Sequence, residues 1–189
     1  MSDPWASLDA TAQAELVRRG EATPLDLVEA AIARIERLDR ELNAVIHPLF
    51  EKARAQAADA ASLGDGPFRG VPFLVKDAVC HTAGDPYHCG MRFLKERGWV
   101  AEADTELARR FRRAGFVFVG RTNTPELAMS ATTEPRAYGA THNPWNVAVG
   151  DADDLRQAAE VLDKFGTSLV GIYAQKTGLE TSEIEAMMD

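Results

Sequence analysis

The fold of this chain is decided by two short apolar runs, VPFLV at residues 71–75 and FVFVG at residues 116–120. Each run has the length and the continuous hydrophobicity of a strand buried on both faces of a parallel sheet. Between them lies an amphipathic segment that predicts a helix, with Asp104 as its expected N-cap and Gly115 as its stop. Strand, helix and strand in this order predict a parallel pair, so residues 1–149 are expected to be α/β.

Helix start and stop signals precede the first strand, and they predict three helices, over residues 9–20, 23–38 and 49–62. Thr23, followed by a proline and then by Asp26, is typical of a capped helix start. Apolar residues recur at steps of three and four along the second helix, so one stripe of it is expected to face a core. No strand is predicted after residue 149, where helical spacing continues and indicates a helical tail.

The composition is that of an ordinary globular protein, with 189 residues, of which 46% are hydrophobic and 26% charged. The net charge of −8 argues against sequence-independent binding to nucleic acid, which requires a basic surface. One cluster of basic residues falls mostly on the polar side of its expected helix and is interpreted as a solvated face; it consists of Arg109, Arg110, Arg112 and Arg113.

Nothing in the sequence predicts a membrane or metal partner. No stretch approaches the roughly 20 apolar residues of a membrane span, and the first ten residues lack the apolar core of a secretory signal. With two cysteines and no export signal expected, the cytoplasm is the predicted compartment. Cys80, His81, His88 and Cys89 are close in sequence, but their spacing matches no zinc pattern, so we expect an ordinary loop, no metal and no cofactor.

Lys76 is the first candidate for chemistry because it ends the first predicted strand, where open α/β sheets bind their ligands. A lysine removed from water favours its neutral form, which can act as a base. The alternative is a Lys76–Asp77 pair that only keeps the end of the strand soluble. These residues alone leave both interpretations open.

The segment around Lys76 resembles the lysine motif of the amidase signature family. Two further stretches in the same order resemble that family, so the likeness extends over residues 5–146; the motifs are GVPFLVKD (70–77), GRTNTPELAMS (120–130) and the run from Tyr138-Gly139 to NPWN (143–146). The resemblance implies a truncated amidase-signature fold. Its parts are N-terminal helices and a partial parallel or mixed sheet with helices on both faces, followed here by the helical tail.

The same resemblance implies a chemistry and a small-molecule amide substrate. In the family, a serine attacks an amide carbonyl, and a second serine, held by a cis peptide, passes its proton to a lysine. Lys76 matches that lysine, the general base. Met129, Ser130 and Ala131 resemble the segment that lines the substrate carbonyl pocket. For Ser130, a helix-end serine that bonds the backbone is the alternative.

The chain departs from the family after Asn146. A Gly- and Ser-rich segment with the relay serine follows there in the family, whereas this chain continues VAVGD over residues 147–151. None of its serines lies in a Gly-rich turn; they are Ser2, Ser7, Ser62, Ser130, Ser168 and Ser182. We therefore expect an amidase fragment that keeps Lys76, lacks its serine partners and gives no turnover alone.

The tail resembles a different family, the Clp-type serine peptidases found in phage genomes. The similar stretches are HNPW (142–145), GDADDLR (150–156) and YAQKTG (173–178). The resemblance makes His142 the counterpart of a general base, with a simple loop histidine as the alternative. We therefore expect a partial amidase-signature domain over residues 1–146, joined to a tail over residues 147–189.

Two other functions remain open, namely a remnant of a Clp-type peptidase and a non-catalytic interaction protein. Two parallel strands are few for a sheet that is normally covered on both faces, and missing neighbours leave backbone groups and apolar faces exposed. We therefore expect marginal stability or self-association of the isolated chain.

Overall fold

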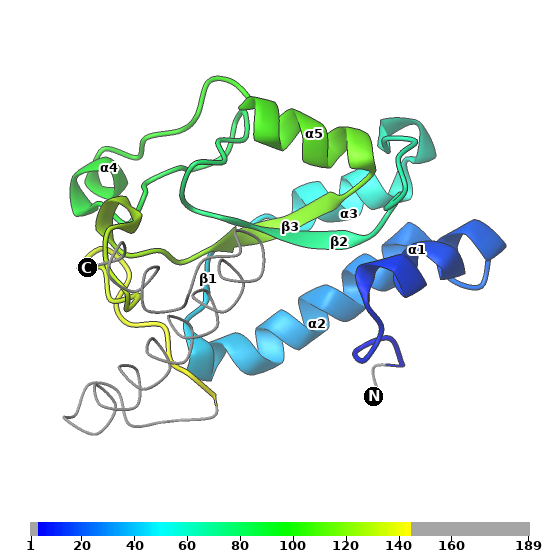
Figure 1. Cartoon of the computed structure of the whole chain (residues 1–189), viewed down its shortest axis with the longest axis horizontal. Coiled ribbons are helices and arrows are strands. Elements are labelled where there is room, and N and C mark those ends of the chain that lie inside the picture. The colour runs from blue at the N-terminus through cyan, green and yellow to red at the C-terminus, as the bar shows by residue number, and fades with distance from the viewer. Residues whose placement is uncertain (1–3, 145–189) are drawn as a thin grey trace, which may run out of the picture. The chain divides into compact units, whose positions relative to one another are not determined.

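The structure, a computed structural model, describes residues 4–144 and is mixed α/β (Figure 1). Its sheet has three strands in the order β1-β3-β2. The predicted strands are present as β2 (Pro72–Lys76) and β3 (Val117–Thr122), and they pair in parallel. The α/β fold class is therefore confirmed. The predicted helical tail lies outside the described residues.

One strand was not expected. β1 (Val45–Pro48) pairs antiparallel with β3 and forms one edge of the sheet. Its four residues, VIHP, show no apolar alternation, and they include a proline, which cannot donate to a ladder. The sheet is therefore mixed.

Helices cover both faces of the sheet (Figure 1). They are α1 (Ala10–Arg19), α2 (Pro24–Leu42), α3 (Phe50–Ala58), α4 (Arg92–Glu96) and α5 (Glu106–Ala114), with short 3-10 helices η1 (Ala60–Ser62) and η2 (Glu126–Ala128). Among residues 4–144, no helix is both long and apolar enough to cross a membrane.

The N-terminal helix signals act as predicted. The Asp9 carboxylate accepts the Ala12 N–H at 2.8 Å, and α1 ends at Gly20, whose φ of 71° is left-handed. At the start of α2, Thr23 and Asp26 form a capping box in which each side chain bonds the other's backbone N–H. These local contacts explain why the starts of α1 and α2 could be assigned from sequence.

Replacing Thr23 with alanine should lower the free energy of unfolding by about 1 kcal/mol, since the cap of α2 loses its acceptor. Urea titration of the variant measures the change. Thr132→Ala, at an exposed position outside any helix, is the control and should stay within about 0.5 kcal/mol of the wild type. Equal losses in the two variants would contradict the capping role.

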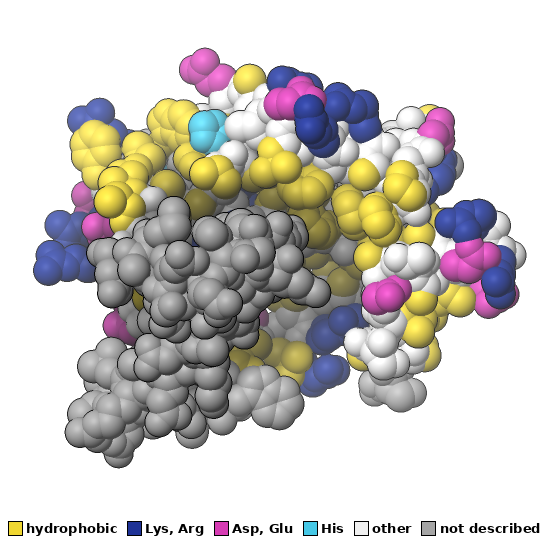
Figure 2. Space-filling model, viewed as in Figure 1, with side chains coloured by type: hydrophobic (Ala, Val, Ile, Leu, Met, Phe, Trp, Pro, Cys, Tyr) yellow, Lys and Arg dark blue, Asp and Glu magenta, His cyan; other side chains and the backbone are white. Residues whose placement is uncertain are grey.

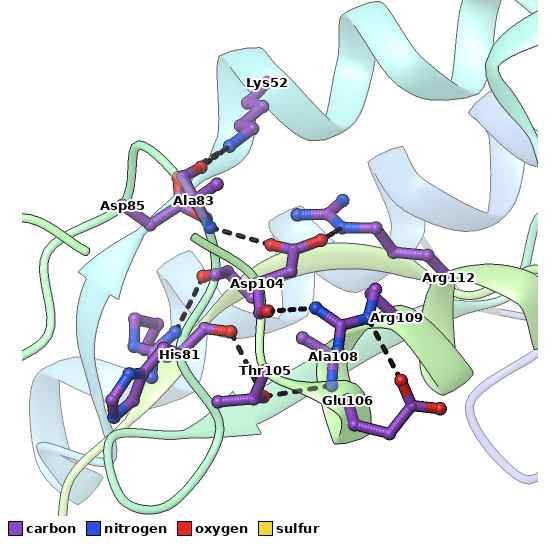
Figure 3. Close-up of polar contacts among 12 residues, drawn as sticks. Lys52, His81, Ala83, Asp85, Asp104, Thr105, Glu106, Ala108, Arg109 and Arg112 are labelled. Carbon is purple, nitrogen blue, oxygen red and sulfur yellow. Dashed lines mark hydrogen bonds and ion pairs between the residues drawn. The ribbon is translucent and has the colours of Figure 1, made fainter. Parts of the chain in front are cut away.

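Three helix boundaries differ from the prediction. The second helix, expected over residues 23–38, continues to Leu42. The N-cap of α5 is Thr105, whose hydroxyl accepts the Ala108 N–H at 3.2 Å, and not Asp104. The Asp104 carboxylate instead accepts the Ala83 N–H at 2.7 Å and pairs with Arg112 at 2.8 Å (Figure 3). The third helix, expected over residues 49–62, ends at Ala58, because Asp59 is extended and caps η1.

The arginine-rich face of α5 is largely solvated, as predicted. Arg109, Arg110 and Arg113 are exposed and each pairs with Glu106 at 3.0 Å. Their hydrogen bonds, that of Arg110 foremost, lower the pKa of Glu106 to about 2. Arg112 is the exception, because it is half-buried against Asp104.

The core divides between the two faces of the sheet. On one face, Val75 and Phe118 pack with Ala108 of α5. On the other face, Val117 and Val119 pack against α2 and α3, through residues such as Val28, Ile32 and Ala53. Successive residues of β3 thus point to opposite faces, as the pleat requires.

β2 is less buried than predicted. All residues of β3 are buried except Thr122, whereas of β2 only Val75 is buried, Pro72, Phe73 and Leu74 are half-buried and Lys76 is exposed. The reason is position, since β3 is the central strand and β2 forms an edge of the described sheet.

Candidate functional site

Lys76 stands at the carboxyl end of β2, beside the carboxyl end of the parallel strand β3. This edge is where open α/β sheets place their ligands. The Lys76 side chain is exposed, and within residues 4–144 no hydrogen bond or ion pair engages its amine. Lys76 is thus accessible to a group brought from outside the described fold.

A fully buried ion pair lies directly behind Lys76. The Arg121 guanidinium donates to the Asp77 carboxylate at 3.2 Å, and both side chains are 0% exposed. Each Asp77 oxygen also lies 3.2 Å from the His88 N–H, which donates to them. Burial raises the pKa of Asp77, and Arg121 opposes that rise. The idea that Asp77 is a solubilising surface partner of Lys76 is therefore wrong.

Arg121 also holds the loop that follows Lys76. Its guanidinium donates to the carbonyls of Lys76 at 3.3 Å and Cys80 at 2.6 Å. A further bond, of 2.8 Å, reaches the Thr82 hydroxyl. Sequence reasoning overlooked Arg121. The available signal was a charged residue at the end of a strand that is otherwise apolar, because such a residue needs a buried partner.

The same loop is anchored on its far side by α3 and by the start of α5. Lys52 pairs with Asp85 at 2.8 Å, and the Thr105 N–H donates to the His81 carbonyl at 3.2 Å (Figure 3). Together with the Asp104–Ala83 bond, these contacts fix residues 81–85. The loop after Lys76 is therefore held at both ends.

Left-handed backbone conformations occur after the carboxyl ends of both parallel strands. Val79 has φ 53° and forms a tight turn in which the Cys80 N–H donates to the Ala78 carbonyl at 2.7 Å. Leu127 and Ala128, beyond β3, have φ 55° and 58°. Such conformations are costly for these residues and gather at functional sites. They mark this edge of the sheet as the candidate site.

An aromatic network of the buried His88 and the half-buried His47 and Tyr138 lies near the buried pair. The Tyr138 hydroxyl hydrogen-bonds His88 Nδ1 and, at 3.1 Å, His47 Nε2. The Lys95 amine lies 4.2 Å from the centre of the Tyr138 ring. Burial, together with the neighbouring His88 and the positive charges of Arg121 and Lys95, lowers the pKa of His47 to about 4. Burial likewise lowers the pKa of His88.

These lowered pKa values predict acid sensitivity. The unfolded chain binds protons on its histidines below about pH 6.5, whereas folded His47 binds one only near pH 4. Stability should therefore be complete above pH 6.5 and should fall as the pH drops from 6.5 toward 4. Thermal melts between pH 7 and 5 test this. His47→Gln should flatten the dependence, while His142→Gln, at an exposed position, should leave it unchanged. An equal slope in all three proteins would refute the assignment.

The Cys- and His-containing loop is packed rather than open. Cys80 and Cys89 are buried free thiols, and burial raises the pKa of Cys80. His81 packs against Tyr87, with ring centres 4.0 Å apart. Across residues 4–144, no group of three possible ligands is placed to hold a metal ion.

The second predicted site segment follows β3 and is exposed. Met129 is 82% exposed, and Ser130 and Ala131 are exposed beside it. The Ser130 hydroxyl contacts the Thr132 hydroxyl at 3.5 Å and accepts the Thr132 N–H at 3.4 Å. No hydrogen bond in the described residues joins Ser130 to Lys76. The structure thus places the two segments after neighbouring parallel strands, β2 and β3.

The following segment is tied to the end of α2. The Asn123 side chain donates to the Gly139 carbonyl and the Thr141 hydroxyl, both at 3.0 Å. His142 donates its backbone N–H to the Leu42 carbonyl at 2.8 Å, and its side chain is exposed. No described contact pairs His142 with a hydroxyl that it could activate.

A cleft of about 460 Å³ lies elsewhere, between α1 and the turn at residues 65–69. It contains none of the predicted site residues. It is lined by Ala14, Val17, Arg18, Asp65, Gly66, Pro67 and Arg69.

Comparison with known families decides the relationship. The Amidase family model matches residues 26–149, more than half of the chain. The chain belongs to the amidase family. A Clp protease family model also matches, over residues 126–189, most of which lie outside the described residues.

Several amidase-family proteins are close relatives. A 6-aminohexanoate-cyclic-dimer hydrolase of Paenarthrobacter ureafaciens is 50% identical over 145 residues, which are 77% of this chain and 28% of the hydrolase. One subunit of the glutamyl-tRNA(Gln) amidotransferase of Salinispora arenicola is 42% identical over 147 residues, covering 75% of this chain and 29% of that protein. This amidase chain therefore spans less than a third of the length of these relatives.

Solved structures of amidase-family proteins also match this chain. A structure of 6-aminohexanoate cyclic dimer hydrolase superimposes with a TM-score of 0.69 at 50% identity, over 74% of this chain and 28% of that chain. A bacterial aryl acylamidase gives a TM-score of 0.67 at 30% identity, again over 74% of this chain and 30% of that chain. The described fold thus matches less than a third of each of these two structures.

Proposed function

We propose that residues 1–146 form the lysine-bearing part of an amidase that hydrolyses C–N amide bonds, with Lys76 as its general base. The position of Lys76 supports this most directly. It lies at the carboxyl end of a parallel strand, ahead of a loop fixed by the buried Asp77–Arg121 pair. The family relationship supplies the reaction class.

In this proposal, each group of the site has a defined task. Lys76 as a neutral amine takes the proton of a relay serine, which in turn takes the proton of the serine that attacks the amide carbonyl. Met129, Ser130 and Ala131 line the pocket for that carbonyl. A neutral amine is favoured when it is removed from water, and Lys76 is exposed. The covering that makes Lys76 a base therefore comes from protein outside the described residues.

The chain alone is proposed to be inactive, because none of its described serines, Ser7, Ser62 and Ser130, forms a hydrogen bond with Lys76. The Ser62 hydroxyl donates to the carbonyls of Gln56 and Asp59, both at 2.8 Å. Ser130 contacts Thr132. Neither hydroxyl is bonded to an amine that could activate it. Without a nucleophile and an oxyanion hole, the largest contributions to amide hydrolysis are missing.

The substrate is proposed to be a small-molecule carboxamide, and the proposed compartment is the cytoplasm. A relative is named for a cyclic amide, the 6-aminohexanoate cyclic dimer, and a structure of that hydrolase has been solved in complex with substrate. The free thiols of Cys80 and Cys89 fit a reducing compartment.

The match to the Clp protease model favours a separate origin for the tail. We propose that residues 147–189 are a helical tail of Clp-type descent, joined to the amidase part near the HNPW string. A peptidase remnant is the second candidate function. It would require a role for His142, whose side chain is exposed.

A chimera tests the amidase proposal. Residues 5–142 of this chain replace the matched segment of the Paenarthrobacter hydrolase, and hydrolysis of the 6-aminohexanoate cyclic dimer is measured. Activity within about tenfold of the parent is expected, because half of the matched residues are identical. A chimera that unfolds cooperatively, and is therefore folded, but does not hydrolyse the cyclic dimer would contradict the proposal.

A further inference from the structure

The Lys76 loop, residues 76–80, closes around one nitrogen of a buried side chain. Arg121 Nη2 donates to the Lys76 carbonyl at 3.3 Å and to the Cys80 carbonyl at 2.6 Å, so both ends of the loop meet at the same guanidinium. The side chains of Lys76 and Val79 are exposed, and the other three are buried. The loop therefore has an inner side that packs on the fold and an outer side that presents the Lys76 amine.

Within residues 4–144, the backbone of this loop is what fixes the Lys76 side chain. The Lys76 amine forms no hydrogen bond or ion pair with another described residue. Figure 2 shows hydrophobic side chains gathered over β2 and α4, the elements that precede and follow this loop in the chain. Such side chains offer an amine no polar anchor. The placement of the amine therefore depends on the conformation of the Lys76 loop.

Val79, near the end of the loop, adopts a conformation that its own side chain opposes. Its φ of 53° is left-handed, which is costly for a β-branched residue. It is the centre of the three-residue turn between Ala78 and Cys80, and such a turn with positive φ is rare and strained. The Val79 side chain is 76% exposed, so packing does not offset this cost. Another contact must hold Val79 in place.

Tyr87 supplies that contact. Its hydroxyl accepts the Val79 N–H at 3.0 Å. The Tyr87 side chain is 9% exposed, and its ring centre lies 4.0 Å from that of His81 and 5.8 Å from that of Trp99. The Arg121 guanidinium lies 5.3 Å from the same ring centre. One buried side chain thus reaches both the strained residue and the guanidinium on which the loop closes.

We propose that Tyr87 is a positioning residue for Lys76 in the amidase reaction. Its hydroxyl holds Val79 in the left-handed turn, and the turn keeps the Lys76 amine where proton transfer requires it. Without that acceptor, Val79 relaxes toward negative φ and the loop shifts, and a displacement of about 1 Å near a reacting group can cost about 10²-fold in rate. This inference rests on the proposed function, and it adds a residue that acts through the backbone.

Kinetics in the hydrolase chimera test this role. Tyr87→Phe keeps the ring and removes the hydroxyl, so kcat should fall at least about tenfold while KM stays within about twofold. Adding Val79→Asn should restore most of the lost kcat, because asparagine tolerates a left-handed φ without being held. A loss of packing would not be rescued in this way. Trp99→Phe, which changes a ring beside Tyr87 but keeps the hydroxyl, is the matched control and should leave kcat within about twofold.

Amide hydrogen exchange in the full chain tests the contact without turnover. Tyr87→Phe should speed exchange of the Val79 N–H at least about tenfold, because that N–H loses its acceptor and the turn opens more often. The amides of β3 should keep their wild-type rates, which shows that the fold is retained. Unchanged exchange of the Val79 N–H would overturn the positioning role.

The kinetic outcomes separate the two proposals. A folded wild-type chimera without hydrolysis overturns the amidase function, and the positioning role falls with it. An active chimera overturns the positioning role alone if Tyr87→Phe keeps its kcat or if Val79→Asn rescues nothing. An equal loss of kcat in the Trp99→Phe control has the same consequence, because it assigns the effect to packing.

Discussion

Replacing Lys76 with alanine in the active hydrolase chimera is expected to reduce amide hydrolysis by about 10⁴-fold. The reason is chemical, since the proposed role of the Lys76 amine, at the end of β2, is to take the proton that a relay serine passes on from the attacking serine. Members of such a catalytic unit act together, so loss of one removes most of the rate. The measurement is kcat and KM for the cyclic dimer in the chimera and its variant.

Lys76→Arg is the informative control. Arginine keeps the positive charge and similar length but cannot lose its proton in a protein. If Lys76 is the base, the arginine variant should be as inactive as the alanine variant, with little change in KM. Recovery of activity by arginine would show that Lys76 contributes only charge.

Replacing Arg121 with methionine is expected to lower the free energy of unfolding of the chain by about 3–5 kcal/mol, because it leaves Asp77 as an unpaired buried charge. The carbonyls of Lys76 and Cys80 lose their donor as well. Urea or thermal unfolding measures the loss. Arg110→Met is the matched control, since Arg110 is an exposed arginine of α5, and should stay within about 0.5 kcal/mol.

A double variant separates the ion pair from simple packing. Asp77→Leu combined with Arg121→Met removes both buried charges, so the double variant should be more stable than either single variant. Additive losses would show that the two side chains act independently. Because this pair fixes the loop after Lys76, the chimera carrying Arg121→Met should also lose activity even where it remains folded.

Local signals predicted the helical part of the fold well. The caps at Asp9 and Thr23 act within three residues of chain, so the sequence displays both partners together. Local signals predicted the wrong N-cap for α5, because Asp104 and Thr105 are adjacent and both residue types can cap a helix. The Asp104 carboxylate instead accepts the backbone N–H of Ala83, which is distant in sequence, so no local sequence pattern predicts that contact.

The candidate site was predictable only in part. The position of Lys76 at the end of β2 followed from one apolar run, and its family motif could be recognised. The Asp77–Arg121 pair joins residues 44 positions apart, so only the paired strands reveal it. The strand β1 was missed because VIHP lacks a strand pattern and is held by its partner β3. The partial burial of β2 depends on which neighbours a sheet has, and that is a property of the assembled fold.

The most direct test of the proposed inactivity of the chain alone is a carboxamide hydrolysis assay on the purified full chain, with and without Lys76→Ala. Both proteins are expected to hydrolyse the amide no faster than buffer alone, since no hydrogen bond joins Lys76 to a serine among residues 4–144. Cleavage by the wild-type chain that disappears in the Lys76→Ala variant would contradict this expectation.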